Sequence, residues 1–148
     1  MRLPTLLPLG AALLSASVAL AAGQATLDEA KAMAIQAADN LRANGPEKAF
    51  QAFNVKDGPW HDRDLYVFVQ NDQEIMVMNG NNPGLVGKNV AGIKDPNGRS
   101  ISAEMRAVKD AGWIDFSWQN PATMRIEPKR AYVVRVGDYL LGVGAYTQ

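Results

Sequence analysis

Two segments of the sequence, residues 65–70 and 128–136, constrain the fold more than any other part of the chain. Both alternate aliphatic residues with aromatic or polar ones, a pattern typical of β-strands. Side chains two positions apart point to the same face of a sheet, so Tyr66 and Phe68 share one face and Val67 points to the other. Both faces are therefore apolar and both require a cover. Such a face either packs against a helix or holds a small ligand.

The first 22 residues have the composition of a secretory signal peptide. Met1 and Arg2 give a positive start, residues 6–20 form an uncharged apolar run, and residues 19–21 have the small-x-small form of a cleavage site. We expect a signal peptide at 1–22, a single domain at 23–148, and a periplasmic or secreted product that is soluble after cleavage. An uncleaved anchor is the alternative, although the run is shorter than the ~20 residues of a membrane span.

The charge balance argues against nucleic acid as a partner. The chain has 15 basic and 15 acidic residues among 148 and no Cys. Proteins that bind nucleic acid usually concentrate basic residues on one face. Without Cys there is no haem attachment motif, and His61 is the only His, so neither a cofactor nor a metal site is predicted.

Helix signals follow the predicted cleavage site. Thr26 and Glu29 have capping-box spacing, and apolar residues, mostly Ala, then recur at helical intervals up to Asn44 and Gly45. Pro46 suits the first position of a second, short helix. The Ala-rich stripe should pack closely against one face of the sheet.

The remaining chain predicts a hairpin, a long loop, a helix and three strands. Residues 65–70 and 74–79 form the hairpin, which should lie inside the sheet, with Met76 and Met78 on one face. Residues 79–98 are rich in Gly, Asn and Pro and are the candidate cover of the second face. A helix over about 100–110 precedes strands at 113–118, 127–136 and 139–146. Gly142 and Gly144 leave one strand face bare, which permits close approach.

The fold class is therefore α+β: an N-terminal helix packed on an antiparallel sheet of about five strands, with a ligand-facing loop and helix as cover. This order resembles the PAS-like sensor architecture. At the residue level the chain resembles the single Cache domain in its type 2 form. The segments that carry the resemblance are residues 57–59, 65–69, 85–89 (LVGKN), 94–98 (KDPNG), 112–121 (GWIDFSWQNP), 128–132 (PKRAY) and 142–146.

The resemblance implies an extracytoplasmic sensor module with a pocket for a small organic molecule, commonly a short carboxylate. Two departures are visible: the first hairpin turn, around Gln73, lacks the family's usual Gly, and Asn79 stands where the family often has His. If the His of the relatives helps to hold their ligand, the departure at Asn79 bears on ligand affinity and ligand choice. The implied partners are the ligand and a membrane-bound signalling or respiratory protein, and a homodimer is possible.

The resemblance and the residue pattern together predict the pocket. A strand lysine among apolar neighbours is costly to bury unless it is paired, and a carboxylate ligand would pair Lys129. Tyr66, Trp118 and Tyr132 offer donors on apolar bodies. The predicted ligand-binding residues are Tyr66, Phe68, Met76, Met78, Trp118, Lys129 and Tyr132, with Asn79 and Arg106 as additional candidates.

Alternatives remain open at this stage. Lys129 could be exposed or paired with Glu127 or Asp115, the aromatic residues could be ordinary core, and strand alternation puts Lys129 and Tyr132 on opposite faces unless a bulge intervenes. Catalysis is not expected because no recognisable catalytic constellation is present. The alternative function is a ligand-free interaction or dimerisation module associated with a membrane or respiratory partner, whose pocket would be filled by its own side chains.

Overall fold

The computed structural model describes residues 23–147, so the predicted signal peptide lies outside the described residues. Two helices open the domain, α1 (Leu27–Asn44) and α2 (Pro46–Phe53). They are followed by β1 (His61–Asp62), β2 (Leu65–Asn71), β3 (Met76–Asn79), the short 3-10 helix η1 (Pro83–Leu85) and α3 (Ile101–Ala107). Three long strands complete it: β4 (Ala111–Gln119), β5 (Ile126–Val136) and β6 (Tyr139–Tyr146).

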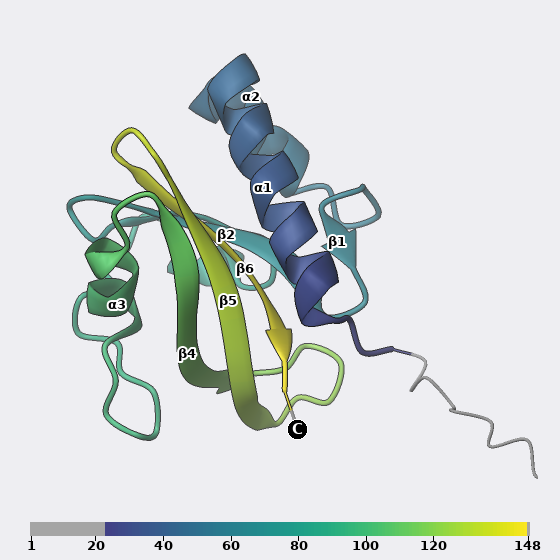
Figure 1. Ribbon diagram of the computed structural model, residues 1–148, viewed down its shortest axis with the longest axis vertical. Coiled ribbons are helices and arrows are strands. Elements are labelled where there is room, and N and C mark those ends of the chain that lie inside the picture. The colour runs from purple at the N-terminus through teal and green to yellow at the C-terminus, as the bar shows by residue number, and fades with distance from the viewer. Residues whose placement is uncertain (1–22, 148) are drawn as a thin grey trace, which may run out of the picture.

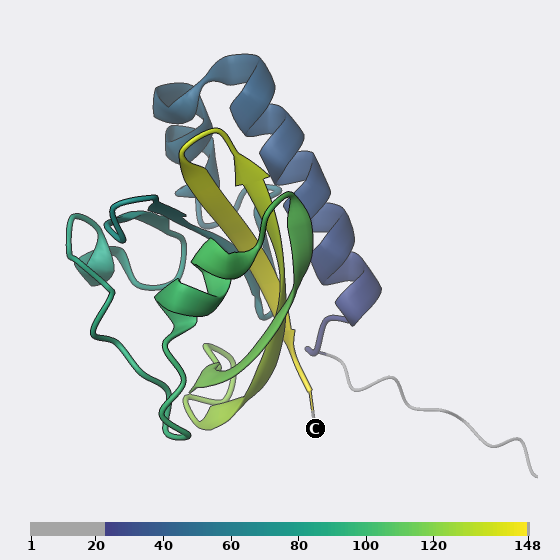
Figure 2. The ribbon, with the colours of Figure 1, turned by 60° about the vertical axis from the view of Figure 1, so that its left-hand side comes forward.

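The strands form one antiparallel sheet in the order β1-β2-β6-β5-β4, with β3 also paired to β2. The α+β class and the N-terminal helix on an antiparallel sheet are confirmed. The six strands exceed the expected five because β1 adds a two-residue pair with β2. Figures 1 and 2 show α1 and α3 on opposite sides of the sheet.

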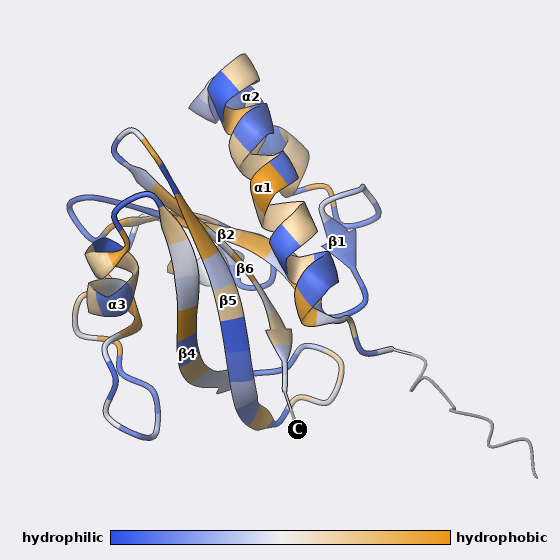
Figure 3. Cartoon of the chain, viewed as in Figure 1, coloured by the Kyte–Doolittle hydropathy of each residue, from blue (hydrophilic) through white to orange (hydrophobic). Residues whose placement is uncertain are grey.

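The first helix begins and ends where its sequence signals predict. Glu29 N donates to Thr26 Oγ1 at 3.2 Å and Thr26 N donates to Glu29 Oε2 at 2.7 Å, which completes the capping box. The helix ends at Asn44, and Pro46 occupies the first turn of α2. Hydrophilic and hydrophobic residues alternate along α1, as expected of a helix with one buried face (Figure 3).

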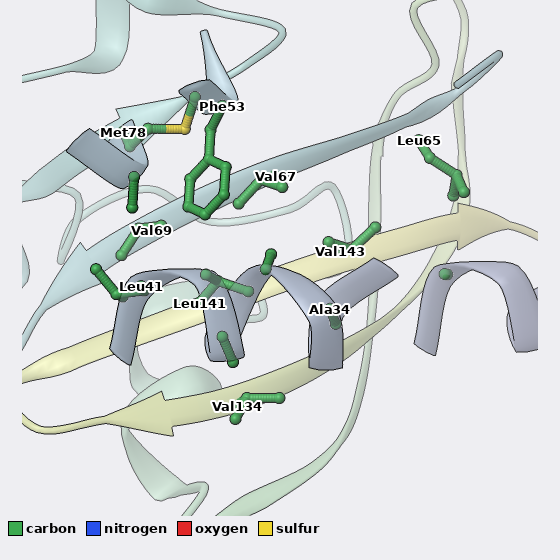
Figure 4. Packing of buried hydrophobic residues seen from close by; sticks show 14 of the residues in the cluster. Ala34, Leu41, Phe53, Leu65, Val67, Val69, Met78, Val134, Leu141 and Val143 are labelled. Atoms are coloured by element: carbon green, nitrogen blue, oxygen red, sulfur yellow. The ribbon is translucent and has the colours of Figure 1, made fainter. Parts of the chain in front are cut away.

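One face of the sheet is filled by α1 and α2. We call it the helix-covered face, and on β2 it consists of Leu65, Val67 and Val69. The buried positions of α1 are Ala30, Ala34, Ala37, Ala38 and Leu41, so four of five are Ala, whose small side chain lets the helix lie close to the strands. Figure 4 shows Phe53 and Leu41 packed over Val67, Val69 and Leu141.

The opposite face is covered by the loop before α3 and by α3 itself. We call it the pocket face, and on β2 it consists of Tyr66, Phe68 and Gln70. A cluster of buried residues on this face joins Tyr66 and Phe68 to Val90 of the loop and Met105 of α3. The expected loop-and-helix cover is therefore present. Ser100 Oγ accepts from Ala103 N at 3.3 Å and caps α3, which ends at Ala107, earlier than the expected limit near 110.

The second hairpin strand differs from expectation in two respects. Among the named strands β3 pairs only with β2, so it lies at an edge, where backbone bonds from Met76 N to Lys88 O and from Gly87 N to Met76 O join it to the loop. The β2–β3 register also shifts between Val69 and Gln70: Val69 pairs with Met78, but Gln70 pairs with Met76. This bulge places one extra residue on β3, so strict alternation fails there.

Within residues 23–147, no helix combines the length and apolar character needed to cross a membrane.

Candidate ligand-binding pocket

A cavity of about 40 Å³, measured for the centre of a water-sized sphere, lies between the pocket face and its cover. The sheet, the loop before α3 and α3 itself all contribute residues to the wall of this cavity. The strands supply Tyr66, Phe68, Gln70, Met76, Asn79, Phe116, Trp118 and Lys129, the loop supplies Leu85, Val90 and Ile93, and α3 supplies Ile101, Ser102 and Met105. A single water needs ~10–15 Å³ by this measure, so the space fits a few non-hydrogen atoms.

Among the described residues that line this wall, Lys129 alone carries a charged side chain. It is 2 % exposed, and its Nζ has no hydrogen-bond partner within residues 23–147. The ammonium lies 3.9 Å from the ring centroid of Tyr66, 5.4 Å from that of Phe68 and 4.9 Å from that of Tyr146. Such aromatic faces attract a cation, by ~2 kcal/mol or more when it is desolvated, but they accept no conventional hydrogen bond.

The two glycines of β6 make room for this arrangement. A Cβ atom at Gly144 would lie 2.7 Å from Lys129 Cε, and one at Gly142 would lie 2.5 Å from Phe68 Cζ. Real Cβ atoms do not approach other atoms so closely, so any side chain here would displace the lysine or the ring. The bare strand face predicted from the alternate glycines is therefore occupied by the lysine stem and an aromatic ring.

The acids proposed as alternative partners of Lys129 are engaged elsewhere. Asp115 pairs with Arg130 at 3.2 Å. Glu127 accepts from Asn120 Nδ2 at 2.8 Å and from Thr123 Oγ1 at 2.7 Å, bonds that, in that order, lower the pKa of its carboxyl. Lys129 is thus neither an exposed strand lysine nor a member of an ion pair with either acid.

The other polar groups in the wall are held by local hydrogen bonds. Gln70 Nε2 donates to Ser102 O at 3.2 Å, which ties β2 to α3. Asn79 Oδ1 accepts from Asn81 N and Asn82 N at 3.1 and 2.8 Å. These two donors identify the amide oxygen of Asn79. Asn79 is a wall residue, and its Nδ2 group is a neutral donor.

A tyrosine pair lies beside Lys129. Tyr146 is paired with Lys129 in the sheet, and its hydroxyl donates to Gln119 O at 2.6 Å. Burial, followed by the nearby Tyr66 hydroxyl and then the Asp64 carboxylate, raises the pKa of Tyr146 far above its ordinary value. The phenol therefore stays neutral and does not serve as a counter-anion for the lysine.

The cover is anchored to β4 through Asp95. One carboxylate oxygen accepts from Asn97 N and Arg99 N, both at 2.9 Å, and the other accepts from Ser117 N at 3.0 Å. Desolvation opposes ionisation of Asp95, but the backbone donors of Arg99, Ser117 and Asn97 together outweigh it and lower the pKa. This carboxylate fixes the tip of the loop against the strand that carries Phe116 and Trp118.

Five of the seven principal residues predicted from the sequence line the pocket together with one additional candidate. They are Tyr66, Phe68, Met76, Trp118 and Lys129, with Asn79.

Three predicted residues lie elsewhere. The bulge in β3 turns Met78 to the helix-covered face, where it is 1 % exposed. Tyr132 follows the uninterrupted β5 register and packs on the α1 side, with its ring 5.0 Å from that of Trp113. The long side chain of Arg106 points outward from α3 and pairs with Glu74 at 3.2 Å. Strand parity therefore separates Lys129 from Tyr132, with no bulge between them.

Sequence reasoning missed several wall residues, and two of them carried a usable signal. Gln70 lies two positions beyond Phe68, so alternation alone assigns it to the same face. Phe116 is the β4 partner of Lys129, which follows once the β4–β5 register is known. Ser102, Val90 and Ile93 carry no such signal because their positions depend on the path of an irregular loop and a seven-residue helix.

No group of three or more His, Cys, Asp or Glu residues within the described range 23–147 is arranged to hold a metal ion. His61 instead lies with Nε2 at 3.0 Å from Phe53 O.

The sequence is similar to known proteins of one family. The sequence profile of the family described as "Single Cache domain 2" matches residues 9–148. The methyl-accepting chemotaxis protein McpP of Pseudomonas putida is 26% identical over 117 residues, which are 76% of this chain and 21% of McpP. The chain thus spans about a fifth of the length of that relative.

Solved structures have the same fold. A methyl-accepting chemotaxis protein from Vibrio parahaemolyticus aligns with a TM-score of 0.71 at 24% identity, covering 80% of this chain and 86% of the other. A structure described as the basis for carboxylic acid recognition by a Cache chemosensory domain aligns with a TM-score of 0.63 at 25% identity, covering 82% and 88%. The periplasmic sensor domain of a chemotaxis protein aligns with a TM-score of 0.61 at 21% identity, covering 82% and 90%.

Proposed function

Because the chain belongs to the single Cache domain 2 family, we propose that it is a sensor domain whose pocket binds a short monocarboxylate through Lys129. The observation that carries the proposal is the ammonium of Lys129, which is 2 % exposed and has no hydrogen-bond partner in the described part of the chain. A buried charge without a partner is costly, and an anion in the adjacent cavity would remove that cost. Asn79 Nδ2 would supply a second, neutral donor.

The size and chemistry of the cavity narrow the ligand class. A volume of about 40 Å³ suits an acid of a few carbons. Apart from Lys129, the wall residues that the structure describes include no ionisable acid or base other than the Tyr66 phenol. An amino acid would therefore leave its ammonium unpaired, and a dicarboxylate its second anion. The apolar residues from the loop and α3 suit a short alkyl tail. Carboxylic acid recognition by a related Cache domain supports the same class.

The relatives also suggest how the domain is used. McpP is a chemotaxis protein, and one structural neighbour is a periplasmic sensor domain. We infer that this domain senses its ligand outside the cytoplasm and passes the signal to a membrane-bound partner, without catalysis.

The second candidate function is an interaction or dimerisation module. Met124, in the turn before β5, is 66% exposed and Ile126, the first residue of β5, is 57% exposed. Together they form an apolar surface that favours a protein contact. This alternative predicts that no small acid stabilises the protein.

Calorimetry with acetate, propionate, succinate and glycine tests the proposal. Acetate or propionate should bind saturably and raise the melting temperature, as mass action requires of a ligand of the native state. Lys129→Met removes the charge with little change of volume and should abolish binding. Lys94→Met, which alters an exposed lysine of the cover, is the matched control and should bind normally. Failure of every acid to bind, or full binding by Lys129→Met, contradicts the proposal.

A further inference from the structure

Asp64 is a buried charged residue that the proposed binding site does not use. The residue is 0 % exposed and lies just before β2. Its Oδ1 accepts from Ala25 N at 2.8 Å, whereas Oδ2 has no hydrogen-bond partner within residues 23–147. The described region contains two buried side-chain atoms in this condition, and the other is Lys129 Nζ. The two unpartnered groups carry opposite charges.

Contacts of Tyr146 relate these two groups to each other. Tyr146 pairs with Lys129 in the sheet, and its ring centroid lies 4.9 Å from the ammonium. Gln24 Nε2 donates to Tyr146 O at 3.1 Å, and the next residue, Ala25, donates its backbone N–H to Asp64 Oδ1. Asp64 also lies in the turn between β1 and β2, two positions before Tyr66, whose ring centroid is 3.9 Å from the ammonium. The Asp64 carboxylate contributes to the raised pKa of Tyr146, so both buried charges act on the surroundings of this tyrosine.

Each of the two charged groups is held by its own neighbours. The backbone amide of Ala25, at the entry to α1, fixes one carboxylate oxygen. The ammonium, in turn, is confined by Gly144 and the Tyr66 ring. Two opposite charges buried in a protein attract each other beyond hydrogen-bonding distance, and much more strongly than the same pair would at equal separation in water.

We propose that Asp64 is the built-in counter-charge of Lys129, which stabilises the empty pocket and lowers its affinity for anions. A ligand carboxylate at Lys129 would be repelled by Asp64 while it is attracted by the lysine. The affinity part of this inference rests on the proposed function. The mutual stabilisation of the two charges does not.

The affinity test uses Asp64→Asn, in which the amide oxygen still accepts from Ala25 N but the negative charge is lost. Acetate or propionate should bind on the order of tenfold more tightly than to the unmodified protein. A purely structural role would instead weaken binding. Asp62→Asn changes an exposed acid two residues away and should leave the affinity unchanged. Unchanged or weaker binding by Asp64→Asn, with Lys129-dependent binding intact, overturns the inference and leaves the proposed function standing.

A stability cycle tests the same pair without any ligand. The change in melting temperature caused by Asp64→Asn is measured in the unmodified protein and in Lys129→Met. If the charges stabilise each other, the change is more favourable in the Lys129→Met background, where Asp64 has lost its counter-charge. Equal changes in the two backgrounds overturn the inference, even if no carboxylate binds.

Discussion

The two faces of the sheet are built from the same strands but are covered in different ways. The helix-covered face lies under the 18-residue helix α1 and is filled by alanines, Phe53 and Leu141. The pocket face lies under an irregular loop and the seven-residue α3, and it buries Gln70, Asn79 and Lys129. Close packing on the helix-covered face stabilises the fold. The pocket face stabilises it less, because it contains a cavity and an unpaired charge.

A single strand shows how the sequence produces this difference. On β5, Lys129, Ala131 and Val133 face the pocket side, while Tyr132 and Val134 face α1. Alternation along the strand therefore places neighbouring residues on faces with different roles, without any change in backbone conformation. The faces should respond separately to substitution, and each of the following changes tests that separation.

The largest effect is expected on the helix-covered face. Phe53→Ala removes a side chain that is 0 % exposed and should cost ~3–5 kcal/mol of unfolding free energy. Chemical denaturation measures this loss. The control is Val55→Ala, which should change stability little because the native valine is 54 % exposed. Carboxylate affinity of the folded fraction should be unchanged. A parallel loss of affinity would show that the faces are coupled.

A smaller loss, with an effect on binding, is expected from Gly142→Ala. The added Cβ would lie 2.5 Å from Phe68 Cζ, so the ring must move into the cavity. Overpacking of this kind typically costs ~1–3 kcal/mol, and the smaller cavity should weaken ligand binding. Gly112→Ala has nothing within 4 Å of the new atom and serves as the control. Normal affinity in Gly142→Ala would mean that the ligand does not need this space.

Loss of the α1 cap should be milder. Thr26→Ala removes the hydroxyl that accepts from Glu29 N and should cost ~1 kcal/mol. The midpoint of urea unfolding reports the change. Because Thr26 is not one of the residues that line the cavity, ligand affinity should stay the same, and a clear decrease would argue against independent faces.

The smallest effect should appear only in acid. The pKa of Asp95 is lower in the folded protein than its ordinary value of 3.8, so its stabilising contribution is present above about pH 4 and is lost as the pH falls through the folded pKa. Between pH 4 and 2 the unmodified protein should therefore lose more stability than Asp95→Asn, as followed by thermal unfolding. Identical acid profiles would mean that Asp95 does not hold the cover through its charge.

Much of the fold could be predicted because its signals are local. The Thr26–Glu29 capping box, Pro46 and the Ala stripe depend only on helix geometry, and the assignment of Tyr66 and Phe68 to one face depends only on strand alternation. For Lys129 the sequence left an exposed, an ion-paired and a buried side chain open, and the structure shows it buried among aromatic rings.

The wrong predictions concern residues whose orientation depends on contacts between distant parts of the chain. The bulge opposite Val69 and Gln70 reverses Met78, and nothing in residues 74–79 alone reveals it. Arg106 lies on a short helix whose rotation depends on its packing, and its ion pair with Glu74 takes it outward. The loop residues of the wall likewise depend on contacts made by the folded chain, such as the bonds of Asp95 to β4.

The close approach of Gly144 to the lysine stem also has an entropic consequence. A free lysine side chain has up to ~2 kcal/mol of rotamer entropy to lose on becoming ordered. With Lys129 Cε lying over Gly144 and its ammonium over Tyr66, most of that disorder is already lost when the chain folds. A ligand would therefore meet a pre-oriented cation, and little of its binding free energy would be spent on immobilising the lysine.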